Sequence, residues 1–213
     1  KFNVHGQRIW GTYYGDSITD VLLMIKTDTA GNLVVLGETD NALSTAFGST
    51  GTFGPTVAMG KRYIARFTPG GQRVWGSYVP GYVSSVAIDN GGNVYIAGSV
   101  DNTVTTGIGT NGTHQPAFGG GFGDAFLMKL YNNGQRAWGT YYGGTGSEGI
   151  ADVYCSDSNY IHVCGSTGSS NGISTAGTYQ TALAGVDDGF LARFNAAGKL
   201  VWGSYYGTTG LDH

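Results

Sequence analysis

The residues able to support metal or acid–base chemistry are few in this sequence, and they are not spaced as most known sites require. The four histidines, His5, His114, His162 and His213, form neither an H-x-x-x-H pair nor a cluster with cysteine. Zinc sites usually need such closely spaced ligands. Neither a G-x-S-x-G nucleophile elbow nor a phosphate-binding loop is present. We therefore expect no catalytic residue, no metal ligand and no cofactor, and the protein is predicted not to be an enzyme.

Three aspartates recur at one position of a repeated hairpin: Asp28, Asp89 and Asp157. Carboxylates at such turns usually accept hydrogen bonds from their own backbone. Calcium binds where several oxygens converge, but the D-x-D-x-D-G spacing of a calcium loop is absent. Turn capping is the expected role, and calcium is the alternative.

The two cysteines, Cys155 and Cys164, fall on two neighbouring predicted strands of one hairpin. If the turn between the strands centres on Asn159 and Tyr160, Cys155 stands directly opposite Cys164. Directly opposed positions of an antiparallel pair are close enough for a disulfide. Such a bridge would suit an oxidising compartment. The alternative is two buried thiols at ordinary core positions.

A tryptophan marks the same position in each repeat of the chain. The motif W-G-x-Y begins at intervals of 65, 63 and 64 residues, at Trp10, Trp75, Trp138 and Trp202. A fixed interval of this kind identifies a repeat protein. The tryptophans are either a ring of sugar-stacking platforms or packing anchors of the repeat. Their constant place on a predicted strand favours packing.

A cation also recurs, at Lys1, Arg66, Lys129 and Arg193. One interpretation is a charged ring around an axial site. The other is a salt bridge, or a side chain that snorkels to solvent, repeated because the whole unit is repeated. The second interpretation requires no ligand.

Each period contains four predicted strands, which we name a to d. Strands a and b form a hairpin with a turn rich in Asn and Gly, at residues 21–28 and 33–38, 83–89 and 94–99, and 150–157 and 160–166. Strands c and d form a second hairpin, whose turn carries the glycine or asparagine that positive φ angles require. Strand d contains the W-G-x-Y motif. Glycine is too frequent, and the apolar positions alternate too regularly, for helices.

Repetition of a four-stranded antiparallel sheet predicts an all-β fold, a β-propeller with blades of about 64 residues. The single domain, residues 1–213, would comprise a c–d remnant, three complete blades and the start of a further unit: 1–15, 16–79, 80–142, 143–206 and 207–213. Three blades are too few to close a ring, since propellers have about four to eight. The chain is then part of a larger propeller, is completed by a second copy or another protein, or stacks openly.

Composition excludes several functional classes. Charged residues make up 12% of the 213 residues, the net charge is −3, and no basic run occurs, which argues against nucleic-acid binding. No stretch of about 18 apolar residues is present, so no membrane span is expected. The 39 glycines, together with many aromatic and β-branched residues, are typical of short strands joined by tight turns.

Four segments resemble one family of repeats. They are WGTYYGGTGSE at 138–148, GNVYIAG at 92–98, GTYQ at 177–180 and DGFLARFNAAGKLVW from Asp188. Together they are similar to the bacterial SBBP-type β-propeller repeat, and the resemblance extends over the whole chain. It implies a secreted or cell-surface, adhesin-like, non-enzymatic protein. Two departures from the pattern are the segment at 79–82 and the pair at 61–62, where the family has an acidic residue.

Function is expected on one end of the predicted blades. The long b–c segments, about 39–60, 101–123 and 168–187, and the glycine-rich d–a loops would share that end, and loops on a rigid scaffold usually carry function. A related tetrapeptide in each b–c segment places Phe53, His114 and Tyr179 as a candidate recognition ring; the alternative is that they pack each loop onto its blade.

The expected function is adhesion or protein assembly through this loop face, with a protein partner or a second copy as ligand. The alternatives are a lectin-like propeller that binds glycans, and a fragment of a larger propeller enzyme.

Overall fold

The computed structural model describes residues 1–213 except 42, 57–60, 156–158, 211 and 213. The described residues form twelve strands and no helix, and therefore no helix that could cross a membrane. In chain order the strands are β1 (Asp20–Thr27), β2 (Leu33–Thr39), β3 (Arg62–Phe67), β4 (Arg73–Val79), β5 (Tyr82–Ile88), β6 (Val94–Asp101), β7 (Gly123–Leu130), β8 (Arg136–Tyr142), β9 (Glu148–Cys155), β10 (Tyr160–Thr167), β11 (Asp188–Asn195) and β12 (Leu200–Tyr206).

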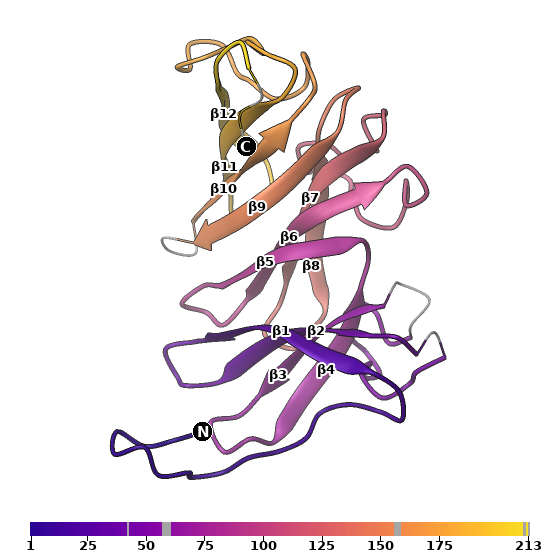
Figure 1. Cartoon of the computed structure of the whole chain (residues 1–213), viewed down its shortest axis with the longest axis vertical. Coiled ribbons are helices and arrows are strands. Elements are labelled where there is room, and N and C mark those ends of the chain that lie inside the picture. Colours follow the sequence, from indigo (N-terminus) through magenta and orange to yellow (C-terminus); the bar gives the residue numbers. More distant parts are fainter. Residues whose placement is uncertain (42, 57–60, 156–158, 211, 213) are drawn as a thin grey trace. The chain divides into compact units, whose positions relative to one another are not determined.

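The strands form three four-stranded antiparallel sheets, in which each strand pairs with its neighbours in sequence (Figure 1). Their orders are β1-β2-β3-β4, β5-β6-β7-β8 and β9-β10-β11-β12. The predicted all-β fold and the four-stranded antiparallel repeat are confirmed. The arrangement of the sheets as a propeller stays a prediction.

Contacts divide the chain into two compact units. Unit 1 comprises Lys1–Val79 with Asn133–Gln135, and unit 2 comprises Pro80–Asn132 with Arg136–His213. Unit 1 contains the sheet β1–β4. Unit 2 contains the sheets β5–β8 and β9–β12, and within it β9 packs against β5, β6 and β7 (Figure 1).

The core of unit 2 is formed by residues from both of its sheets. Tyr95, Leu127 and Tyr142 come from the first sheet, and Val163 and Phe190 from the second; all are buried. Successive side chains of a strand point to opposite faces, so each sheet supplies every second residue to this core. Burial of each such side chain contributes roughly 1.5–3 kcal/mol.

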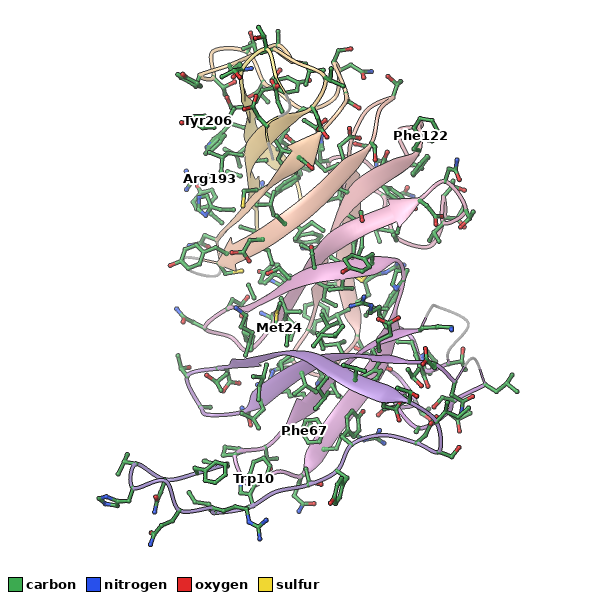
Figure 2. The ribbon with its side chains drawn as sticks, viewed as in Figure 1. Trp10, Met24, Phe67, Phe122, Arg193 and Tyr206 are labelled. Carbon is green, nitrogen blue, oxygen red and sulfur yellow. The ribbon has the colours of Figure 1, made fainter. Side chains whose placement is uncertain are left out.

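Unit 1 has an aromatic core. Phe47 and Tyr63 are stacked with ring centroids 3.9 Å apart, and Tyr14 meets the edges of Tyr63 and Phe67 at 5.6 and 5.0 Å. Figure 2 shows Trp10 close to Phe67, and both line the same small cavity of this unit. The segment that precedes β1 therefore covers one face of the β1–β4 sheet.

The predicted strands a to d are the first to fourth strands of each sheet. The long b–c segments, which join β2 to β3, β6 to β7 and β10 to β11, run along the outer edge of strand d, which is β4, β8 or β12. In the β5–β8 sheet, Thr110 N–H donates to the carbonyl of Gly139 at 2.8 Å, and Tyr141 N–H donates to the carbonyl of Gln115 at 2.9 Å. The other two sheets have equivalent bonds at Gly76 and Gly203. These segments cover an edge strand that would otherwise expose its backbone groups.

The predicted opposition of Cys155 and Cys164 is wrong. Cys155 pairs with Ile161, and Cys164 pairs with Asp152, because β9 ends and β10 begins farther apart than the two-residue turn assumed from the sequence. Ile161, the partner of Cys155, stands three residues before Cys164 on β10, and residues an odd number of positions apart on a strand point to opposite faces. Cys155 packs against the core of unit 2, whereas Cys164 lines a groove on the other face, and the two sulfurs form no disulfide.

Candidate functional site

The repeated tryptophan packs under the c–d turn of the following repeat. In unit 2 the indole N–H of Trp138 donates to the carbonyl of Ala196 at 2.8 Å. A Cβ atom at Gly198 would lie 2.8 Å from the indole, and Gly198 has a φ of +73°. Only glycine accommodates both that conformation and that approach. We call this contact of tryptophan and turn the joint.

The same joint occurs in unit 1. Trp10 donates its indole N–H to the carbonyl of Pro69 at 3.0 Å and covers Gly71, where a Cβ would lie 3.1 Å from the indole. Trp75 covers Gly134, where the corresponding distance is 2.9 Å. Each joint glycine also stands four residues before the tryptophan of its own repeat. That regularity is visible in the sequence, but our prediction did not connect these glycines with the tryptophans.

His114 lies at the joint of unit 2. Its backbone N–H donates to the carbonyl of Gly198 at 2.9 Å. Its ring lies 5.8 Å from that of Tyr142 and 6.1 Å from that of Phe194, and burial lowers the pKa of its imidazole. His114 thus tethers the b–c segment of one repeat to the turn of the next.

Phe53 occupies the equivalent position in unit 1, since its N–H donates to the carbonyl of Gly134 at 3.0 Å. The tetrapeptides therefore reach both ends of the sheet. Phe53 and His114 bond to the c–d turns, whereas Gln115 accepts from the N–H of Gly143 in a d–a loop at 3.1 Å. A recognition role for Phe53, His114 and Tyr179 stays a prediction.

A tyrosine at the end of strand d completes the joint. In unit 2, Tyr142 is fully buried and meets the edges of Phe190 and Phe194 at 5.2 and 5.4 Å. Its hydroxyl donates to the carbonyl of Ile173 at 2.6 Å. Tyr142 thereby covers the neighbouring sheet with an apolar ring while its polar atom is satisfied, as buried tyrosines require.

The β9–β12 sheet carries nearly the same residues on the corresponding face, but no turn among the described residues covers them. Leu191 is 47% exposed and Tyr206 is 65% exposed, whereas the equivalent Leu127 and Tyr142 are 0% exposed. Tyr179, the equivalent of His114, is 84% exposed, and Trp202 is partly exposed. We call Tyr179, Leu191, Trp202 and Tyr206 the open face.

The open face is hollowed. A cavity of ≈ 420 Å³ is lined by all four residues of the open face, and the rings of Tyr179 and Tyr206 lie 5.9 Å apart. A second groove of ≈ 560 Å³ continues past Leu191 and Tyr206 to Cys164. Figure 2 shows Tyr206 and Arg193 on the same side of this sheet. The site is large enough for a protein segment or a small ligand.

Three of the four recurrent cations contact groups of their own repeat. Arg66 forms an ion pair with Asp28, and Lys129 Nζ lies 3.6 Å from a carboxylate oxygen of Asp89. The guanidinium of Arg193 lies 3.5 Å from the centre of the Tyr160 ring. These contacts agree with the interpretation of the recurrent cations as structural groups that are repeated with the unit and require no ligand.

The turn aspartates are occupied by their own hairpins. Asp89 accepts hydrogen bonds from the N–H groups of Gly91 and Asn93, from the Asn93 amide and from the Tyr95 hydroxyl. Burial alone would raise the pKa of Asp89, but the bonds from Asn93 and the charge of Lys129 lower it. Asp28 is capped by Ala30 and Asn32 in the same way.

Asp157, the third predicted turn aspartate, lies outside the described residues. Within the described part of the chain, no three side chains of His, Cys, Asp or Glu group together as metal ligands.

A pair of buried carboxylates, Asp124 and Glu148, was missed from the sequence. Asp124 accepts from the amide of Gln115 at 2.9 Å and from the N–H of Gly119 at 2.6 Å. Glu148 accepts from the hydroxyl of Thr167 at 2.8 Å. Burial, helped by the charge of Glu148, raises the pKa of Asp124 to about 6. These carboxylates organise the loops at the other end of the sheets, and their only sequence signal is an acidic residue at the start of a strand.

Comparison with known proteins places the chain in no named group. No family model and no curated protein matches its sequence. A crystal structure described as a protein of unknown function from Bacteroides caccae is similar over 88% of this chain and 52% of that chain, with a TM-score of 0.40 and 12% identity. The present chain therefore spans about half the length of that protein.

Proposed function

We propose that this chain is a non-enzymatic β-propeller-type repeat module that binds protein through the open face. The observation that carries the proposal is the contrast in unit 2. The face of the β5–β8 sheet with Leu127 and Tyr142 is buried by the next repeat, whereas the same face of the β9–β12 sheet exposes Leu191 and Tyr206. An exposed apolar patch with polar surroundings is typical of a protein interaction site.

The internal joint supports a protein ligand over a small one. In the preceding repeat, the residues equivalent to the open face contact protein. Trp138 packs against the glycine turn at Gly198, and Tyr142 packs against two phenylalanine rings. Buried aromatic residues dominate the energy of protein interfaces. The proposed role is assembly or adhesion, with the SBBP-like resemblance in favour of a secreted or cell-surface bacterial protein.

A glycan is the second candidate, because aromatic rings such as Tyr179, Trp202 and Tyr206 also stack on sugars. Sugar recognition in addition needs polar groups that fix the orientation of the ligand. The nearby hydroxyls of Thr178 and Ser204 already bond to backbone groups of the b–c segment and of β12. This favours protein over glycan. Assembly through the open face therefore replaces the loop face of the sequence-based hypothesis as the leading mode of binding.

A chain extended by one repeat tests the proposal. Residues 144–206 are appended after Gly207, and hydrogen exchange of the β12 segment is compared between the extended and the original chain. We expect the appended repeat to protect Trp202 and its neighbours and to raise the unfolding temperature. Unchanged exchange in β12 would overturn the proposal.

A glycan array, read for the original chain and for a Tyr179→Ser/Tyr206→Ser variant, tests the second candidate. The matched control is Tyr13→Ser, since Tyr13 is fully exposed in unit 1. Glycan binding that is lost in the double variant and kept in the control would establish a lectin and overturn a protein-binding role for this face. The absence of glycan binding supports the protein module.

A further inference from the structure

We propose that the partner of the open face is the N-terminal hairpin, residues 1–10, of a second copy of this chain. The inference rests on the proposed function, namely that the open face binds protein, and adds the identity of the ligand. The hairpin is the one c–d unit whose turn glycine meets no neighbour within the described residues: a Cβ atom at Gly6 would have nothing within 4 Å.

The turn of this hairpin has the geometry of the turns that form the internal joints. Asn3 N–H donates to the carbonyl of Gln7 at 2.9 Å, and Gly6 N–H donates to the carbonyl of Asn3 at 3.1 Å. The turn that covers Trp138 has the same two bonds, from Asn195 to Lys199 and from Gly198 to Asn195, both 2.9 Å. The φ angles of Gly6 and Gly198 are +75° and +73°. The hairpin is therefore already folded in the shape that a joint requires.

The register of the hairpin places an aromatic residue where the joint needs one. Phe2 pairs with Arg8 as Phe194 pairs with Leu200. Phe2 is 65% exposed, whereas Phe194 is fully buried against Tyr142 and His114. In a joint between two copies, Phe2 would pack against Tyr206 and Tyr179, which are the equivalents of Tyr142 and His114.

Two hydrogen bonds would complete this contact. By analogy with the bond from Trp138 to Ala196, the indole N–H of Trp202 would donate to the carbonyl of Val4. By analogy with the bond from His114 to Gly198, the backbone N–H of Tyr179 would donate to the carbonyl of Gly6. Neither donor has an acceptor among the described residues of its own copy, and burial of an apolar face with its polar groups satisfied favours association.

The contact uses a different surface on each copy, because the hairpin of one chain meets the open face of the other. Such an interface is heterologous, so a bound pair still presents one free hairpin and one free open face to further copies. The partner is thus a copy placed head to tail, with no requirement for a two-fold axis. A variant that lacks one of the two surfaces should consequently not associate with itself, and should form a single contact with a copy that keeps the missing surface.

Two variants of the full-length chain test this inference by complementation. Trp202→Ala removes the receiving surface and keeps the hairpin, whereas Phe2→Asp removes the hairpin contact and keeps the open face. Sedimentation velocity is measured over a wide concentration range for each variant, for the original chain and for the Tyr13→Ser control. Circular dichroism verifies that each variant is folded.

We expect the original chain and the Tyr13→Ser control to associate with rising concentration, and each of the two joint variants to remain a monomer. An equimolar mixture of Trp202→Ala and Phe2→Asp should form a 1:1 heterodimer and nothing larger. A monomeric original chain at all concentrations, or association that persists in Phe2→Asp, would overturn the inference. Either result would overturn only the identity of the partner. The proposed function is tested separately by the appended-repeat experiment, which does not depend on a second copy.

Discussion

The two sheets of unit 2 present nearly the same residues in two different environments. Trp138 and Trp202 begin almost identical W-G-x-Y-Y segments, yet Trp138 is buried under the turn at Gly198, and Trp202 is partly exposed. The environment of a repeated residue is thus decided by the neighbouring repeat, as expected where stability is a sum of repeats and their interfaces. The same side chain is a core residue in one repeat and, under our proposal, a binding residue in the other.

The largest difference should appear when each tryptophan is truncated. Trp138→Ala removes a buried indole and its hydrogen bond to Ala196, so we expect a loss of about 3–5 kcal/mol in the free energy of unfolding. Trp202→Ala in dilute solution should cost less, because Trp202 is partly exposed and no turn among the described residues covers its indole. Denaturant unfolding of the two variants measures both values, and equal losses would contradict the comparison.

Substitution of Gly198, the glycine of the joint, should likewise cost more stability than substitution of Gly6, the glycine of the uncovered hairpin. Gly198→Ala adds a methyl group against the indole of Trp138 in a left-handed conformation, and we expect a loss of about 2–4 kcal/mol from strain and overpacking. Gly6→Ala has the same φ problem but meets no neighbour, so its cost should be about 1–2 kcal/mol and confined to the hairpin. Hydrogen exchange resolves the local from the global effect. A Gly198→Ala chain as stable as the original would show that the joint is not tightly packed.

The stability of unit 2 should depend on pH through its buried carboxylates. Because the pKa of Asp124 is raised to about 6 from an ordinary value of 3.8, the folded state binds this proton more tightly than the unfolded state. Its ionisation therefore destabilises the fold above pH 6, and the penalty is relieved as the pH falls toward 5. We expect about 1 kcal/mol of relief between pH 7.5 and pH 5, after allowance for solvent screening.

His114 acts in the opposite direction, because burial lowers its pKa and protonation at low pH favours the unfolded state. The comparison with Asp124→Asn separates the two groups, since His114 is present in both chains. The stability of the original chain relative to Asp124→Asn should rise on acidification, as followed by thermal unfolding at the two pH values. A difference that is constant with pH would show that Asp124 titrates normally.

The smallest effect is expected on the open face itself. Tyr179→Ser should change the free energy of unfolding of the monomer by less than about 0.5 kcal/mol, as is usual for exposed positions. His114→Ser should cost more, because the His114 ring packs on Tyr142 and Phe194. Equal costs measured by denaturant unfolding would mean that Tyr179 is already packed in the isolated chain.

The repeat interval predicts the strands well, because the alternation of apolar residues and the turn glycines are local signals. It does not predict contacts between repeats. The opposition of Cys155 and Cys164 failed because it depended on the length of one turn. The bonds of Phe53 and His114 to the c–d turns were not predicted, because the b–c segments have no strand pattern although they bond along the edge of strand d. The proximity of Asp124 and Glu148 was not predicted either. These residues lie on β7 and β9, which belong to different sheets, and the residue pattern within a strand does not reveal such contacts.

The exchange of the indole protons tests the central claim most directly. In a chain labelled with ¹⁵N at tryptophan, each indole N–H gives one NMR signal, and Trp202→Phe assigns the signal of interest. We predict slow, concentration-independent solvent exchange for Trp138, which donates to Ala196. Trp202 should exchange quickly in dilute solution and become protected as the concentration rises. A Trp202 signal as protected as that of Trp138 at the lowest concentration, or one that exchanges quickly at every concentration, would contradict the account.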